Sequence, residues 1–172
     1  MRILVTGGVR SGKSRHAESL VPGPATYVAP GPTLAEDADP DWAARVKAHQ
    51  DRRPPTWTTV EARDLAAALG IRGPVIVDCL GTWLSAVLDE RALWDSPSAE
   101  AETVVRGLVE EAADVIRGRD DVVLVTNEVG LGVVPAHRSG RLFRDLLGRV
   151  NQEIAAACDE VHLVVAGRVL RL

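Results

Sequence analysis

The stretch Gly7-Gly8-Val9-Arg10-Ser11-Gly12-Lys13-Ser14 matches the pattern G-x-x-x-x-G-K-[ST] in full. It lies between an apolar run at residues 3–6 and a helical pattern at residues 13–20, as a phosphate-binding loop (P-loop) requires. Glycines let backbone amides close around phosphate oxygens, and the following helix points its N-terminal amides at the anion. We therefore expect residues 7–14 to bind nucleotide phosphates, with Lys13 on the β- and γ-phosphates and Ser14 holding Mg²⁺.

Outward from this loop, short apolar runs alternate with helical patterns. The runs cover residues 3–6, 25–29, 57–60, 75–79, 122–126 and 161–166. The helical patterns cover residues 13–20, 41–52, 62–69, 82–89, 99–117 and 139–157. Runs that are apolar on both alternating faces are typical of parallel strands covered by helices. The order predicts an α/β fold, a P-loop NTPase-like three-layer sandwich with a mostly parallel central sheet, and a last strand or tail after Gly167.

The composition is that of an ordinary globular domain. The chain has 172 residues, 46% hydrophobic and 26% charged, and we expect one domain, residues 1–172. A net charge of −4 with 3% aromatic residues argues against a nucleic-acid-binding surface. No apolar run is long enough for a membrane span. Cys79 and Cys158 lack framework spacing, so we expect reduced thiols, a cytoplasmic protein and no zinc site.

A carboxylate follows one of the apolar runs. Val75-Ile76-Val77-Asp78 is an apolar strand that ends in Asp78, which is the Walker-B arrangement for a Mg²⁺ ligand on a strand neighbouring the P-loop. The alternative is that Asp78 only terminates the strand. The base-reading motif N-K-x-D of GTPases is missing, because Asn127-Glu128-Val129-Gly130 begins like it and then departs. A regulatory GTPase switch is therefore disfavoured.

A histidine near the end of a predicted helix is a candidate nucleophile. Asp39-Pro40 marks the helix start, because Asp caps free amides and Pro fixes the first helical φ. Arg45 and His49 then share one face at i and i+4, and Gln50-Asp51-Arg52-Arg53 follows. Neighbouring guanidinium groups keep an imidazole neutral, and a neutral imidazole can attack phosphorus. The alternative, on spacing alone, is a helix-end histidine without a chemical role.

Several sequence blocks carry a resemblance to a known family. They include Arg45-Val46-Lys47-Ala48-His49-Gln50-Asp51-Arg52-Arg53-Pro54, Trp57-Thr58-Thr59-Val60-Glu61 and Asn127-Glu128-Val129-Gly130-Leu131-Gly132-Val133-Val134-Pro135. Together with the P-loop they resemble the bifunctional adenosylcobinamide kinase / adenosylcobinamide-phosphate guanylyltransferase family of cobalamin assembly. The match extends over essentially the whole chain. These blocks are far more specific than the P-loop, which many kinases share.

The resemblance implies two reactions on one P-loop domain. ATP or GTP phosphorylates the aminopropanol hydroxyl of adenosylcobinamide. GTP then gives GMP to adenosylcobinamide-phosphate, which forms adenosylcobinamide-GDP and releases pyrophosphate. In this family the second reaction passes through a guanylylated histidine, and the matching position is His49, so Lys13 and His49 are the expected catalytic residues. The resemblance also implies a homotrimer.

The resemblance further implies nucleotide contacts outside the P-loop. They are expected from Ala29, Pro30, Gly31, Gln50, Asp51, Arg52, Arg53, Glu61 and Asp78. Three places depart from the family pattern: Ala48 stands where a second histidine is often found, Pro30 stands where Thr or Ser is common, and Ser85-Ala86 replace a frequent Thr-Asn pair. None of these departures touches the P-loop or His49.

Two other functions stay open on the sequence alone. One is a different small-molecule P-loop kinase in which His49 is structural and no guanylyl group is transferred. The other is a nucleotide-dependent switch or assembly factor. Of the remaining histidines, we expect His16 on a helix surface, His137 in an exposed loop and His162 in a structural position within a strand.

Overall fold

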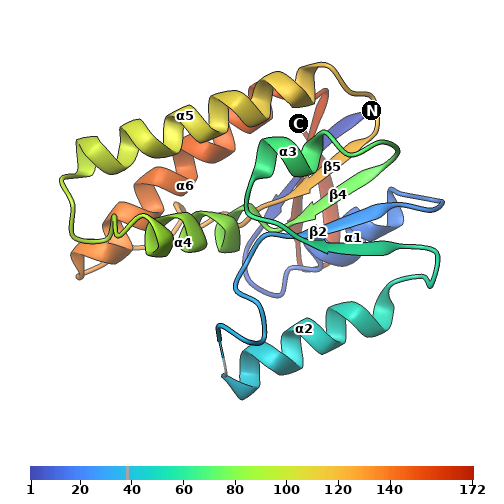
Figure 1. Ribbon diagram of the computed structural model, residues 1–172, viewed down its shortest axis with the longest axis horizontal. Helices are drawn as coiled ribbons and strands as arrows, with labels where there is room; N and C mark the ends of the chain where they lie inside the picture. The colour runs from blue at the N-terminus through green and yellow to red at the C-terminus, as the bar shows by residue number, and fades with distance from the viewer. Residues whose placement is uncertain (38) are drawn as a thin grey trace.

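The structure is a computed structural model that describes residues 1–37 and 39–172. Helices and strands alternate along the chain (Figure 1). Helix α3 begins later than residue 62 because the Asp64 carboxylate accepts a hydrogen bond from the Ala67 amide and caps the helix. In chain order the elements are β1 (Arg2–Gly7), α1 (Lys13–Ser19), β2 (Thr26–Ala29), α2 (Pro40–Arg52), β3 (Thr58–Glu61), α3 (Leu65–Leu69), β4 (Val75–Asp78), α4 (Leu80–Glu90), α5 (Ser98–Arg117), β5 (Val122–Val125), α6 (Arg138–Ala157), β6 (Glu160–Val165) and β7 (Arg168–Arg171).

The strands form one sheet in the order β3-β2-β4-β5-β1-β6-β7. Neighbouring strands are parallel except β6 and β7, which are antiparallel. The predicted α/β class with a mostly parallel sheet is confirmed. Strand β1 is central, and its Leu4 pairs with Leu124 of β5 and Val161 of β6. The carboxyl ends of parallel strands meet at one edge of the sheet. The P-loop after β1 and Asp78 at the end of β4 therefore emerge at the same edge.

Helices cover the two faces of the sheet unequally. On one face α3, α4, α5 and α6 pack over a larger core that includes Leu4, Val77 and Leu124 (Figure 1). On the other face α1 covers a smaller core that includes Val5 and Ile76. Leu4 and Val5 join different cores because side chains alternate along a strand. Within the described residues, no helix has both the length and the apolar character that crossing a membrane requires.

Helix α2 is attached differently from the other helices. It begins at the predicted Asp39-Pro40 start, where the Asp39 carboxylate accepts a hydrogen bond from the Asp41 amide, a cap worth about 1 kcal/mol. No residue of α2 is buried, and the helix lies well apart from α4, α5 and α6 (Figure 1). A polar link joins its last turn to α1, where Arg52 pairs with Glu18 at 3.0 Å. The position of α2 therefore depends on polar contacts.

The turn between β6 and β7 contacts the P-loop. Val165 pairs with Arg168, so Ala166 and Gly167 form a two-residue turn. Both have positive φ, 49° and 75°, which is the combination of a type I′ turn. The Gly167 amide donates to the Ser11 carbonyl at 2.8 Å. The turn therefore supports the loop that is expected to bind phosphate.

Ala166 occupies a left-handed conformation that costs an ordinary residue about 1 kcal/mol. We expect Ala166→Asn to raise the free energy of unfolding by about 0.5–1 kcal/mol, because Asn adopts this conformation more readily. Ala166→Val is expected to lower it, because a β-branched side chain resists positive φ. Urea denaturation of the three proteins measures the differences. An unchanged or lower value for Ala166→Asn would contradict the assigned turn.

Candidate active site

The P-loop folds as a compact turn between β1 and α1. The Ser11 amide donates to the Gly8 carbonyl at 3.3 Å, and the His16 amide donates to the Gly12 carbonyl at 3.0 Å. The Lys13 ammonium donates to the Gly8 carbonyl at 3.2 Å, and Lys13 is only 9% exposed. A buried ammonium needs anionic or carbonyl partners. Phosphate oxygens bound in this loop would supply the anionic ones.

Two glycines of the loop are required by space and by backbone conformation. A Cβ at Gly7 would lie 2.4 Å from the carbonyl oxygen of Val164 in β6 and 2.8 Å from Ser11 Oγ. Gly12 has a φ of 96°, which other residues rarely adopt. Within the part of the chain that the structure describes, the buried Ser11 Oγ has no hydrogen-bond partner. A phosphate oxygen would satisfy it.

Asp78 ends a strand that is not a direct neighbour of β1. Strand β5 lies between β4 and β1, so the expectation of a neighbouring strand is wrong. Two strand spacings separate the strand ends by about 10 Å, a gap that nucleotide phosphates with a metal ion can bridge. The Asp78 side chain is 7% exposed, and its Oδ2 accepts a hydrogen bond from the Tyr27 hydroxyl at 3.1 Å. Asp78 is thus tied to another side chain of the site.

His49 reaches this carboxylate from α2. Its Nδ1 lies 3.3 Å from the Tyr27 hydroxyl, 3.6 Å from Asp78 Oδ2 and 3.4 Å from Arg52 Nη2. Burial lowers the pKa of His49 below its usual value, the Asp78 charge opposes this, and the charges of Arg52 and Arg53 lower the pKa further. The imidazole is therefore neutral near pH 7. The arginines contribute as expected, but burial is the larger cause.

The two arginines after His49 make different contacts. Arg52 is paired with α1, as described above, and its Nη2 also approaches His49. Arg53 lies over the face of Tyr27, with its guanidinium carbon 3.4 Å from the ring centroid, and donates to Thr59 Oγ1 at 2.8 Å. Among the described residues, the buried Arg53 Nε has no hydrogen-bond partner. A phosphate oxygen near His49 would supply one.

Tyr27 is the residue of this cluster that sequence analysis missed. It is 2% exposed and packs against Trp57, with ring centroids 6.4 Å apart. Its hydroxyl joins Asp78 of β4 to His49 of α2. In the sequence it lies within an apolar run, where an aromatic residue indicates core packing. The one available signal is that it is the only tyrosine of the chain.

Four further predicted nucleotide contacts lie at the carboxyl edge of the sheet. Ala29 ends β2 and Glu61 ends β3, and the two residues pair in register. Pro30 is buried directly after β2. A Cβ at Gly31 would lie 2.9 Å from the Cβ of Thr82 on α4, so the backbone there packs tightly. The structure therefore brings this group to the same edge as the P-loop and Asp78.

Two other predicted contacts lie on the outer side of α2. Gln50 and Asp51 are exposed, and Asp51 pairs with Lys47 at 3.1 Å within the helix. Arg45, expected to share a face with His49, is also exposed. The guanidinium that contacts His49 is that of Arg52. Nucleotide contacts from Gln50 and Asp51 stay predictions.

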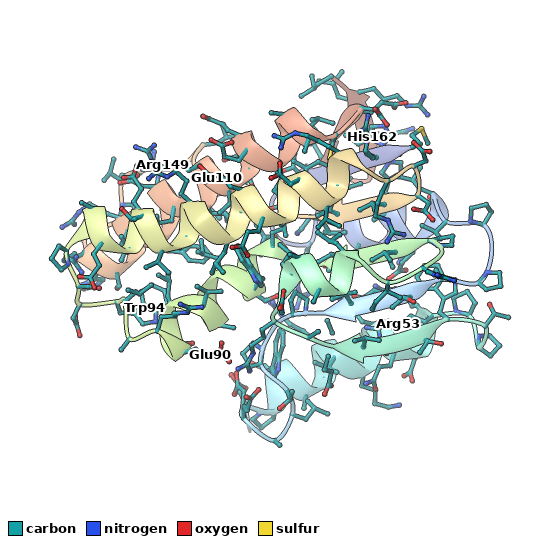
Figure 2. The ribbon with its side chains drawn as sticks, turned by 45° about the horizontal axis from the view of Figure 1, so that its top comes forward. Arg53, Glu90, Trp94, Glu110, Arg149 and His162 are labelled. Atoms are coloured by element: carbon teal, nitrogen blue, oxygen red, sulfur yellow. The ribbon has the colours of Figure 1, made fainter. Side chains whose placement is uncertain are left out.

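His16 does not have the helix-surface role expected for it. Its Nε2 lies 2.9 Å from Nδ1 of His162, and Nε2 of His162 lies 2.8 Å from Glu160 Oε2. Burial lowers the pKa of His16, and the neighbouring His162 adds to this. His162 is 1% exposed in β6, the structural position expected for it. Figure 2 shows His162 far from Arg53, so this histidine pair is separate from the cluster around His49.

A model of the cobinamide kinase / cobinamide phosphate guanyltransferase family matches residues 3–172. The chain belongs to this family. The bifunctional adenosylcobalamin biosynthesis protein CobU of Salmonella typhimurium is 43% identical over 185 residues, which cover 97% of each chain. CobU of Escherichia coli is 39% identical, again over 97% of each chain. CobP of Pseudomonas aeruginosa is 38% identical, over 97% of this chain and 94% of its own. The resemblance seen in the sequence blocks is confirmed.

Two oxygen donors of this cobinamide kinase / guanyltransferase family member, the Ser14 hydroxyl and the Asp78 carboxylate, suit a hard cation. In residues 1–37 and 39–172, no group of three or more His, Cys, Asp and Glu side chains is arranged to hold a metal ion. Cys79 and Cys158 are free, and burial raises the pKa of both thiols, that of Cys158 to about 12. The hydroxyl of Ser14 and the carboxylate of Asp78, completed by phosphate oxygens and water, suit Mg²⁺.

The pKa of Tyr27 reports on the burial of this family member's site. Burial and the negative charge of Asp78 raise the pKa of Tyr27 well above 10.0. Because the chain has one tyrosine, its phenolate absorbance reports on Tyr27 alone. We expect the native protein to titrate at higher pH than the denatured protein. We also expect it to lose stability as the pH rises above about 10, because the folded state disfavours the phenolate. Coincident titration curves would contradict the buried cluster.

Proposed function

We propose that this protein phosphorylates adenosylcobinamide with ATP or GTP and then transfers GMP from GTP to adenosylcobinamide-phosphate. Membership of the family and the names of the relatives support both steps. The observation that carries the second step is His49, a half-buried imidazole of lowered pKa beside Asp78 and Arg52. In a P-loop kinase without guanylyl transfer, the same histidine would have only a structural role. Both steps share one domain, residues 1–172.

In the first step the P-loop positions the nucleoside triphosphate. The amides of the loop and of the N-terminus of α1 bind the phosphates, and the Ser11 hydroxyl, which has no partner among the described residues, adds a donor. Lys13 offsets charge on the transferred phosphoryl group. The substrate hydroxyl attacks the γ-phosphorus and loses its proton to water. The bond to the nucleoside diphosphate breaks, and the diphosphate leaves with that electron pair.

Mg²⁺ would be held by Ser14 and Asp78 in this step. When bound, the ion neutralises charge on the phosphate oxygens. The contacts of Asp78 with Tyr27 and His49 both use Oδ2. Oδ1 is the oxygen that we assign to the metal, so the same carboxylate can serve the metal and the histidine cluster.

In the second step an imidazole nitrogen of His49 attacks the α-phosphorus of GTP. Its lone pair forms an N–P bond, the bond to the bridging oxygen breaks, and pyrophosphate leaves with that electron pair. An oxygen of adenosylcobinamide-phosphate then attacks the same phosphorus, and the N–P electron pair returns to His49. Arg52 and Arg53 stabilise charge on the phosphate oxygens through charge-assisted hydrogen bonds.

We also propose a cytoplasmic homotrimer. The family resemblance supports the trimer, and α2, with no buried residue, offers a surface that a neighbouring subunit would cover. The two free thiols suit a reducing compartment. Light scattering should give a mass near three times 18.4 kDa. A monomer or dimer at micromolar concentration would contradict the trimer without affecting the chemistry.

The guanylyl-histidine is directly detectable. We expect the protein incubated with α-labelled GTP and Mg²⁺ to gain one GMP through a bond that is labile in acid and stable in base, as a phosphoramidate is. Intact-protein mass spectrometry and label retention measure it. His49→Asn is expected to remain unlabelled, because an amide cannot attack phosphorus. An unlabelled wild-type protein, or equal labelling of the variant, would show that the second step is wrong as written.

Lys13→Ala and His49→Asn separate the two steps. Loss of the Lys13 ammonium is expected to lower kcat/KM on the order of 100-fold for phosphorylation of adenosylcobinamide and to slow labelling by GTP as well. His49→Asn should abolish guanylyl transfer and lower phosphorylation far less. Product analysis of each half-reaction with γ- and α-labelled nucleotide gives both rates. Equal losses of both reactions in His49→Asn would indicate one shared catalytic role.

A further inference from the structure

His49 has two ring nitrogens, and the structure engages one of them. Nδ1 faces the Tyr27 hydroxyl, the Asp78 carboxylate and the Arg52 guanidinium, all within 3.6 Å. Across residues 1–37 and 39–172, Nε2 of His49 takes part in no hydrogen bond. The His49 side chain is 30% exposed. Nε2 is therefore the nitrogen that a nucleotide can approach.

The direction of the hydrogen bonds decides which nitrogen carries the proton. A carboxylate oxygen only accepts, so the Tyr27 hydroxyl donates its single proton to Asp78 Oδ2 at 3.1 Å. The Tyr27 oxygen then presents lone pairs to Nδ1 of His49 at 3.3 Å. It can therefore accept only from a protonated Nδ1. A neutral imidazole with its proton on Nδ1 has a lone pair on Nε2.

Arg52 favours the opposite tautomer, but only weakly. Its guanidinium would donate to an unprotonated Nδ1 at 3.4 Å, a contact about as long as that of the Tyr27 hydroxyl at 3.3 Å. Nε and Nη2 of Arg52 already donate to the two carboxylate oxygens of Glu18, at 3.3 and 3.0 Å. A forked bond to a carboxylate is stronger than one to a neutral imidazole. Against this one donor, Nδ1 faces two acceptors, the Tyr27 oxygen at 3.3 Å and Asp78 Oδ2 at 3.6 Å, and together they favour a protonated Nδ1.

The Tyr27 ring is fixed well enough to impose this arrangement. It is 2% exposed, it packs against Trp57, and Arg53 lies over its face. Its backbone pairs with Ile76 of β4, which places the hydroxyl beside Asp78. A hydroxyl held by a buried ring on β2, between β3 and β4, cannot follow His49 if the imidazole turns.

We infer that Tyr27 is a positioning residue for guanylyl transfer: its hydroxyl holds His49 with the proton on Nδ1, so that Nε2 attacks the α-phosphorus. The inference rests on the proposed role of His49. After attack, Nε2 carries the guanylyl group and Nδ1 keeps its proton and its bond to Tyr27. The positive charge of that ring then lies beside Asp78. Without the hydroxyl, the ring can turn or exchange tautomers and present an N–H to the phosphorus.

Tyr27→Phe tests the inference, because it keeps the ring and removes only the hydroxyl. We expect the single-turnover rate of GMP adduct formation to fall about tenfold, the effect of one well-placed hydrogen bond. Phosphorylation of adenosylcobinamide is expected to fall less. Thr103→Val removes a hydroxyl that bonds within α5 and serves as the matched control, with both rates unchanged.

A second measurement reads the tautomer without turnover. In protein with ¹⁵N-labelled histidine, the His49 signals are identified by their loss in His49→Asn. We expect Nδ1 protonated and Nε2 unprotonated in the wild type, and a mixture of tautomers in Tyr27→Phe. A residue with a purely packing role would change stability without changing these signals.

The outcomes separate the inference from the function on which it rests. Slow labelling of Tyr27→Phe with a changed tautomer supports the inference. Normal labelling of Tyr27→Phe, or a wild-type Nδ1 that carries no proton, overturns it and leaves the guanylyl-histidine standing. A wild-type protein that gains no GMP overturns the proposed second step, and the role of Tyr27 falls with it.

Discussion

The carboxylate of Asp78 organises the site. A side chain that is 7% exposed must find polar partners, because an unpaired buried charge is costly. Asp78 finds them on two other elements, Tyr27 on β2 and His49 on α2. Because α2 has no buried residue, apolar packing contributes little to its position. This contact, with the pairing of Arg52 and Glu18, places the helix that carries the proposed nucleophile.

The same carboxylate explains how two reactions can share one sheet. The P-loop and Asp78 lie at one carboxyl edge, two strand spacings apart. One oxygen of Asp78 contacts Tyr27 and His49, which leaves the other for the Mg²⁺ that we propose on the nucleotide. Lys13, Arg52 and Arg53 add positive charge around this edge, and a nucleoside triphosphate brings the complementary negative charge. A second nucleotide site is not needed for this chemistry.

The sequence predicts the parts of this site that depend on local pattern. The P-loop, the cap at Asp39-Pro40 and the apolar strands follow from residue types at fixed spacing, and the structure contains each of them. The strand order does not follow in this way, because a crossover connection leaves open which strand lies beside which. The position of β5 between β1 and β4 could therefore not be predicted from the residue pattern. The contact of His16 on α1 with His162 on β6 could not be predicted from it either.

Tyr27 shows most clearly what a residue pattern cannot predict. Its own run is apolar, and only the pairing of β2 with β4 brings it beside Asp78, because Tyr27 lies in register with Ile76. The strand order alone would still not have predicted the contact of Tyr27 with His49, because His49 reaches the cluster on a helix that polar contacts hold in place. The resemblance to the family supplied His49, but it contained no statement about the group that orients it. The Tyr27 hydroxyl takes that role only in the folded chain, where it lies between Nδ1 of His49 and Asp78.

The two halves of the proposed machinery are held by different forces. The P-loop is fixed by close packing, since a Cβ at Gly7 would lie 2.4 Å from a carbonyl of β6, and by the Gly167 amide on Ser11. Salt and moderate pH act weakly on such contacts. The nucleophile is held by the hydrogen bond of its neutral imidazole to Tyr27 and by the partly exposed ion pair of Arg52 with Glu18. These contacts respond to protonation and to ionic strength. A change in ionic strength or pH therefore disturbs the helix that carries His49 more readily than the loop that holds the phosphates.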